Sequence, residues 1–206
     1  MVLSGSINIQ VTGAINEAGG TAIGLSGRDG SLIQARKLKR KKRDPDSNIE
    51  RVLDLGFVGE PVSINAGVLE DLASSNIIPI IAPLGTGPKG ETFNINADTA
   101  AGAIAAAVGA SRLLMLTDVK GVLNKKGKLI SEMTAAQGRA NIRNGTIKGG
   151  MIPKTETCIK SVGDGVEAAV ILDGRVPHAL ILEIFTEHGA GTLIRKTSKR
   201  YKKRRI

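Results

Sequence analysis

Residues 77–117 read IIPIIAPLGTGPKGETFNINADTAAGAIAAAVGASRLLMLT, and this stretch decides the fold class. Residues 77–82 are a run of β-branched residues, as in fully buried parallel strands. The Ala-rich residues 98–108 predict a helix that Gly109 ends. Residues 112–117 predict a second apolar strand. Strand, helix and strand in this order are typical of an α/β fold with a mainly parallel sheet.

The same alternation extends in both directions. Before residue 77 we predict helices and strands over 6–17, 21–26, 32–38, 55–64 and 66–74, with 21–26 and 32–38 paired as a hairpin. Residues 36–48 and 84–91 are predicted as loops. After residue 117 we predict extended segments and helices over 128–130, 135–143, 154–162, 167–172, 179–185 and 192–194. A doubly wound fold usually opens with a strand, whereas this chain soon enters a helix, so we expect N-terminal strands to be missing.

Composition excludes several classes of protein. Only 2% of the 206 residues are aromatic, and Cys158 is the single cysteine, which we interpret as a small buried hydrophobe. One cysteine allows no intramolecular disulfide, as suits a reducing compartment. No apolar run approaches the ~20 residues of a membrane span, and the N-terminus lacks the features of a secretory signal. We therefore expect a cytoplasmic protein.

The net charge of +10 comes from two segments. Residues 36–43 hold seven Lys or Arg and residues 195–205 hold eight, so the remainder carries 14 basic and 19 acidic residues. The basic segments suggest an alternative function as a nucleic-acid-binding or ribosome-associated module. The scarcity of aromatics argues against it, because base stacking needs them. Residues 195–206 are predicted to be a disordered, solvated tail.

The first candidate site is Phe93-Asn-Ile-Asn-Ala-Asp98. Asn94, Asn96 and Asp98 alternate, so in an extended segment their side chains share one face. One interpretation is that Asp98 caps the following helix. The other is a small-molecule site at the end of a strand.

Two further candidates lie downstream. Thr146-Ile-Lys-Gly-Gly-Met-Ile-Pro-Lys154 places Lys154 in the first turn of a helix starting at Pro153, where a cation opposes the helix dipole. Either an anionic ligand faces it, or it is a solvated lysine. Residues 116–123 (LTDVKGVL) follow a buried strand and form either a ligand loop or an ordinary turn. Residues 85–92 resemble a phosphate-binding P-loop, but Glu91 stands where that motif requires Lys, which excludes it.

Together these segments resemble the acetylglutamate kinase branch of the amino-acid kinase family. The matching motifs, in chain order and covering about residues 1–194, are GTAIGLSGRDG (20–30), DPDSN (44–48), DLGFVGE (54–60), IPIIAP (78–83), FNINAD (93–98), LTDVKGVL (116–123), GGMIPK (149–154) and DGRVPHAL (173–180). The resemblance implies a three-layer αβα sandwich with two lobes. Residues 1–92 would be the remainder of the acetylglutamate-binding lobe, and residues 93–194 the ATP-binding lobe.

The resemblance also implies a reaction and its residues. ATP, as its Mg²⁺ complex, would phosphorylate the side-chain carboxylate of N-acetyl-L-glutamate in arginine biosynthesis, with no general base because that carboxylate is already ionised. Asp98 and Lys154 would be catalytic, and Asn94 and Asn96 would bind substrate. The nucleotide would contact Thr117, Asp118, Gly121, Val122, Leu123, Thr146, Ile147 and Lys148.

The resemblance also implies a regulatory site and the absence of some segments of the family. The segment from Val176 to Thr192 is similar to the arginine-inhibited branch, which implies an arginine site near His178 and Gly191, and the full-length family forms homo-oligomers. The family's Lys-x-Gly-Gly loop, with a second catalytic lysine, and its substrate-gripping Arg have no counterpart here. We expect about 80–100 residues to be absent. We therefore predict a chain with little or no kinase activity, prone to aggregate, or an inactive fragment.

Overall fold

The computed structural model describes residues 2–43, 50–186 and 189–197. The chain forms two compact units, Met1–Val108 and Gly109–Ile206. The sequence placed a division between residues 92 and 93. The structure counts β6 (Thr92–Ile95) and α3 (Ala97–Ala107) with the first unit, because both contact β3 (Glu50–Ile64). Which lobe binds which substrate stays a prediction. The predicted loop 44–48 and residues 198–206 of the predicted tail lie outside the described residues.

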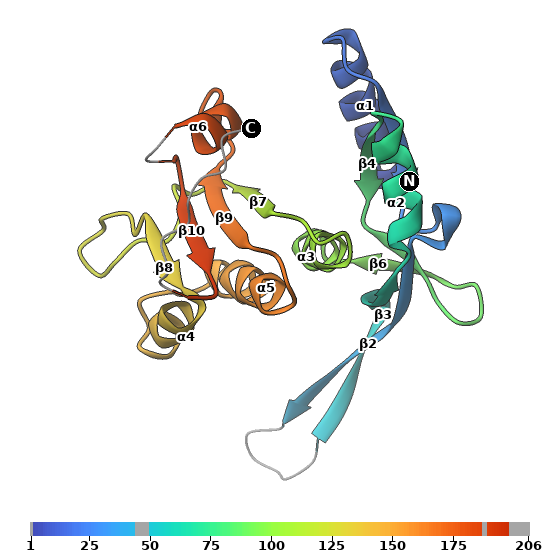
Figure 1. Ribbon diagram of the computed structural model, residues 1–206. Helices are drawn as coiled ribbons and strands as arrows, with labels where there is room; N and C mark the ends of the chain where they lie inside the picture. The colour runs from blue at the N-terminus through green and yellow to red at the C-terminus, as the bar shows by residue number, and fades with distance from the viewer. Residues whose placement is uncertain (1, 44–49, 187–188, 198–206) are drawn as a thin grey trace. The chain divides into compact units, whose positions relative to one another are not determined.

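The first unit combines a small barrel with a two-stranded sheet (Figure 1). Besides β3, β6 and α3, its elements are η1 (Val2–Ile7), α1 (Asn8–Glu17), β1 (Ala22–Ser26), η2 (Asp29–Ser31), β2 (Ile33–Arg43), α2 (Ala66–Ser74), β4 (Ile78–Ala82) and β5 (Leu84–Thr86). Strands β2, β3, β6 and β5 close the barrel, and β1 pairs with β4 in parallel. The core of this unit lies around Leu32, Ile33 and Ile95, which are almost fully buried.

Several strand predictions in this unit were wrong. β1 does not pair with β2, because β1 lies in a separate sheet with β4, and β2 pairs antiparallel with β3, from Ile33 opposite Ile64 to Arg43 opposite Glu50. The basic run 36–43 is therefore part of a strand and not a loop. Residues 84–91 include the short strand β5. Strand β4 is only partly buried, with Ile78 45% exposed.

Helix α1 is attached to the sheet through a polar contact. The Asn8 amide donates hydrogen bonds to the carbonyl oxygens of Leu25 and Ile80, at 3.2 and 2.7 Å. A side chain at Gly24 would collide with Asn8, so the glycine permits this approach. Asn8 is the one buried residue of α1, whereas Ile9 is 69% exposed. Exposed apolar surface of this kind favours association, and the expected aggregation stays a prediction.

The second unit is a four-stranded sheet with helices on both faces. Its elements are β7 (Arg112–Thr117), β8 (Glu132–Thr134), α4 (Ala135–Arg143), α5 (Met151–Gly163), β9 (Ala168–Asp173), α6 (Ala179–Phe185) and β10 (Thr192–Arg195). The strand order is β7-β9-β10-β8, in which β9 pairs parallel with β7 and antiparallel with β10. Arg195, predicted as the start of the tail, belongs to β10. The predicted bounds of α2, β7, α4 and α6 are confirmed.

Alternation along β7 and β9 assigns the helices to opposite faces. Leu114 pairs with Val170, and both belong to the cluster that includes Ala179 of α6. Met115 lies on the other face, where its sulfur is 3.1 Å from the sulfur of Cys158 in α5. Cys158 is fully buried, as predicted. Five of the eight strand pairings found among the described residues are parallel, so the mainly parallel α/β class is confirmed. No helix in the described part of the chain is long and apolar enough to cross a bilayer.

Candidate functional site

Several loops of the second unit meet at one edge of its sheet. β7 and β9 end side by side, with Thr117 opposite Asp173, and we call this the carboxyl edge. Helix α5 packs on β9 and leads into its start, so the first turn of α5 lies at the carboxyl edge. β10 is antiparallel to β9 and begins there. Ligands of open α/β sheets bind at the ends of the strands in this way.

The loop after β7 is held in place at its centre, and the residues before and after the centre are exposed. The buried Val122 N–H donates to Thr192 Oγ1 at 2.8 Å. Gly121 has φ of 127°, and a Cβ there would lie 2.7 Å from the same oxygen. Gly121 and Val122 therefore hold the loop against the start of β10. Asp118 and Leu123 are exposed and Thr117 is half-buried, so a ligand could reach these three of the predicted nucleotide residues.

The segment before α5 is also ordered by its own polar groups. The Thr146 N–H donates to Asn144 Oδ1 at 3.0 Å, and Ile147 is buried. Lys148 is exposed and Gly149 has φ of 56°. The helix starts at Met151, two residues earlier than predicted. Pro153 fits inside its first turn because the N–H groups there have no intrahelical acceptor. Half-buried Lys154 lies at the end of that turn.

Sequence reasoning assigned no site role to the turn at the end of β9. The Arg175 guanidinium donates to both oxygens of Asp173, each at 2.9 Å, and the Arg175 backbone N–H donates to the same carboxylate. These bonds from Arg175, with the positive charge of Lys120 as a smaller cause, lower the pKa of Asp173 to about 2. The Gly174 N–H donates to the Thr117 carbonyl oxygen at 2.8 Å. The sequence signal that could have identified this turn is Asp-Gly-Arg at the end of a buried strand.

The polar triad of the first unit lies where β6 meets α3. Phe93 and Ile95 are buried and Asn94 and Asn96 are exposed, so the predicted alternation is confirmed. The helix cap is Asn96, whose Oδ1 accepts the Thr99 N–H at 3.0 Å. The interpretation of Asp98 as the cap was wrong by two residues. Asp98 lies in the first turn, where the helix dipole favours a carboxylate.

The P-loop-like segment forms a turn between two strands. Glu91 accepts the Lys89 N–H at 2.8 Å through its carboxylate, and the Gly87 N–H donates to the Glu91 carbonyl oxygen. The hydrogen bond from its own backbone N–H and that from Lys89 lower the pKa of Glu91. A P-loop precedes a helix, whereas this segment precedes β6, so it is not a Walker loop.

The two predicted effector residues lie on either side of α6, one just before this helix and one just before β10. A Cβ at Gly191 would lie 2.2 Å from the Ile171 carbonyl oxygen, so no side chain fits there. His178 adopts a left-handed conformation before α6. The buried Glu183 carboxylate accepts the Ala190 N–H at 2.7 Å, two residues before β10. An effector role for His178 and Gly191 stays a prediction.

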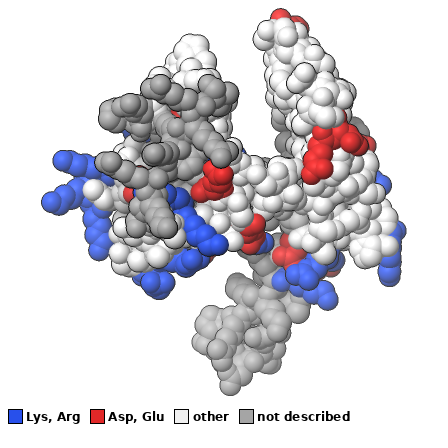
Figure 2. All heavy atoms as spheres, viewed as in Figure 1, with Lys and Arg blue, Asp and Glu red and all other residues white. Residues whose placement is uncertain are grey.

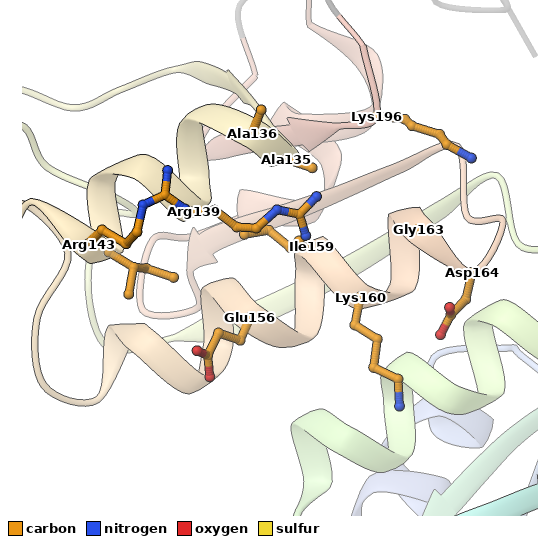
Figure 3. Close-up of a pocket in the computed structure, with 11 residues that line it drawn as sticks. Ala135, Ala136, Arg139, Arg143, Glu156, Ile159, Lys160, Gly163, Asp164 and Lys196 are labelled. Carbon is orange, nitrogen blue, oxygen red and sulfur yellow. The ribbon is translucent and has the colours of Figure 1, made fainter.

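A cavity of about 670 Å³ lies elsewhere in the second unit, in the groove between α4 and α5 (Figure 3). The Arg139 guanidinium extends over Ile159 in this groove (Figure 3). The cavity reaches Lys196, which follows β10 at the edge opposite the carboxyl edge. None of the predicted site residues lines it; the lining residues are Ala135, Ala136, Arg139, Ile142, Arg143, Glu156, Ile159, Lys160, Gly163, Asp164 and Lys196.

Part of the basic run in β2 is neutralised by β3. Arg36 lies 2.8 Å from Glu60 and Lys37 lies 2.7 Å from Asp54. The Lys37 ammonium lowers the pKa of Asp54. These pairs reduce the charge available to nucleic acid. In the second unit, basic side chains also gather over α4 and the loop before β8 (Figure 2). Among the described residues, no three His, Cys, Asp or Glu form a metal-binding group.

Comparison with known proteins defines the class. Residues 1–173 match the model of the amino acid kinase family, and the chain belongs to this family. It is 66% identical over 194 residues to the acetylglutamate kinase of Rhodospirillum centenum, covering 94% of this chain and 64% of that relative. It is 67% identical over 195 residues to that of Rhodospirillum rubrum, covering 95% of this chain and 63% of the relative. The chain thus spans just under two thirds of the length of these curated relatives.

Solved structures agree with the family. The Streptococcus mutans protein smu.665 aligns with a TM-score of 0.73 and 30% identity, over 95% of this chain and 69% of that one. N-acetylglutamate synthase from Neisseria gonorrhoeae, solved with coenzyme A and L-arginine, aligns with a TM-score of 0.70 over 93% of this chain and 45% of that one. At 22% identity this second likeness shows the fold alone. The amino-acid kinase fold expected from the sequence is confirmed.

Proposed function

We propose that this chain carries most of an acetylglutamate kinase, which transfers the γ-phosphoryl group of ATP to the side-chain carboxylate of N-acetyl-L-glutamate. The observation that carries the proposal is 66–67% identity to two acetylglutamate kinases over 94–95% of the chain. The exposed polar loops at the carboxyl edge support it, since such edges bind nucleotides in α/β proteins.

We assign some of the predicted site residues to the nucleotide and others to the phosphoryl acceptor. Lys154 compensates the charge of the transferring phosphoryl group, because phosphoryl transfer depends on positioning and electrostatic stabilisation. Asp98 organises the catalytic lysine side chains. Asn94 binds acetylglutamate, and Asn96 combines substrate contact with its role as cap. The nucleotide residues are those predicted in 117–123 and 146–148. Mg²⁺ enters as part of the ATP substrate.

The biological setting follows from the same proposal. The reaction belongs to arginine biosynthesis in the cytoplasm, and the complete enzyme is a homo-oligomer. Arginine, as end product, binds near His178 and Gly191. The contact between Glu183 and Ala190 supports a site there, because the buried Glu183 carboxylate accepts the Ala190 N–H next to Gly191. Nucleic acid is not a partner in this proposal.

The test is a coupled ADP-release assay with ATP–Mg²⁺ and N-acetyl-L-glutamate. The 206-residue chain contains no Lys-x-Gly-Gly segment, so we expect little or no turnover from it alone. A chimera that adds the part of the R. centenum relative unmatched by this chain should turn over. Lys154→Ala in that chimera should lower kcat by about 10²-fold or more. A chimera that prefers carbamate or free glutamate to acetylglutamate would refute the proposal.

A further inference from the structure

We propose that Arg175, held in place by Asp173, is an anion-binding residue of the carboxyl edge and contacts a phosphate of the bound nucleotide. This inference rests on the proposed nucleotide-binding function. It adds a residue that the sequence motifs for the nucleotide did not include.

The orientation of the guanidinium is the first argument. Nε and Nη2 of Arg175 donate to the two oxygens of Asp173, each at 2.9 Å. The remaining N–H groups, on Nη1 and on the outer side of Nη2, point away from the carboxylate. The side chain of Asp173 is 8% exposed and that of Arg175 is 67% exposed. A buried anchor thus holds an exposed fork in one orientation, and such a fork matches phosphate geometry.

The position of the turn is the second argument. Asp173 pairs with Thr117, and the Gly174 N–H donates to the Thr117 carbonyl oxygen. Arg175 is therefore tied to the loop after β7, whose exposed residues are predicted to contact the nucleotide. The basic groups Lys148, Lys154 and Lys120 belong to segments at the same edge. Arg175 adds a cation at the ends of β7 and β9, where the charge of Asp118 also acts on it.

A purely structural role explains less of the geometry. The turn is closed by the Arg175 N–H and the Asp173 carboxylate, at 3.0 Å, and any residue other than proline at position 175 could supply that N–H. The pair with the buried Asp173 carboxylate accounts for the orientation of the guanidinium, but it uses only Nε and Nη2 and leaves Nη1 of a side chain that is 67% exposed without a role. An arginine fixed at a ligand-binding edge is better accounted for by an anion that it binds.

Calorimetric titration of the whole chain with ADP, adenosine and inorganic phosphate tests the inference. Arg175→Gln should weaken ADP binding about tenfold, leave adenosine binding unchanged and lower the salt dependence of ADP binding. Arg175→Lys should retain part of the affinity, and Asp173→Asn should lose part of it because the fork is no longer held. The matched control is Arg139→Gln in the α4–α5 groove, which should bind ADP as the unmodified chain does.

The outcomes separate this inference from the proposed function. If the unmodified chain binds ADP and Arg175→Gln binds it equally well, Arg175 is not a contact and the nucleotide site stands. If Arg175→Gln weakens the binding of adenosine and of ADP alike, Arg175 supports the structure of the carboxyl edge, and the phosphate contact is refuted. If the unmodified chain binds neither nucleoside nor nucleotide, both proposals fail. Inorganic phosphate competing with adenosine but not with ADP would also contradict a phosphate subsite.

Discussion

At the scale of single residues, Asp173 makes the stability of the second unit sensitive to acid. Its pKa is about 2 in the folded chain, against an ordinary value of 3.8, chiefly because Arg175 hydrogen-bonds to the charged form. A folded-state pKa below the unfolded value gives stability that is present above about pH 4 and is lost as the pH falls towards 2. Asp173→Asn should therefore show a shallower loss of unfolding free energy than the unmodified chain between pH 4 and 2, as measured by urea denaturation. Arg175→Gln should lose the same pH-dependent difference. If the unfolding free energy of all three proteins fell equally between pH 4 and 2, the low pKa of Asp173 would be contradicted.

The candidate residues differ in how far the sequence could predict their surroundings. The alternation of Asn94 and Asn96 with buried neighbours follows from the period of a strand, so it was predictable. The partners of Gly191 and Val122 were not predictable, because each packs against residues far away along the chain. Arg175 was missed for the same reason, since its place beside the loop after β7 depends on strand pairing.

At the scale of elements, Asn96 is expected to stabilise α3 independently of any ligand. Its Oδ1 accepts the N–H of Thr99, one of the N-terminal groups that the helix leaves unpaired. Asn96→Ala should lower the unfolding free energy by about 1 kcal/mol. Asn96→Asp should keep most of that stability, because a carboxylate also caps and suits the helix dipole. Urea denaturation without ligands measures both. A substrate contact by Asn96 would show separately, as weaker acetylglutamate binding in Asn96→Asp at unchanged stability.

Elements were predictable where local patterns determine them. Helices α2, α4 and α6 begin and end at the predicted residues, since apolar periodicity and capping signals are local. The pairing of β2 with β3 was not predictable from hydrophobicity, because seven of the eight residues 36–43 are basic and show no apolar alternation. The barrel was missed for the same reason, and because β5 has only three residues.

At the scale of the whole molecule, the proposals assign the two substrates to segments in different units. A ligand that binds only the folded state raises the free energy of opening of the backbone it contacts, by about 2.7 kcal/mol at one hundred times Kd. In hydrogen-exchange mass spectrometry of the whole chain, ATP–Mg²⁺ should slow exchange in 117–123, 144–154 and 173–175. N-acetyl-L-glutamate should slow exchange in β6 and the start of α3. Helix α2, in which no site residue is predicted, serves as an internal control and should exchange at the same rate with either ligand. If ATP protects residues 135–143 and leaves 117–123 unchanged, the nucleotide occupies the cavity between α4 and α5, and the carboxyl-edge assignment is wrong.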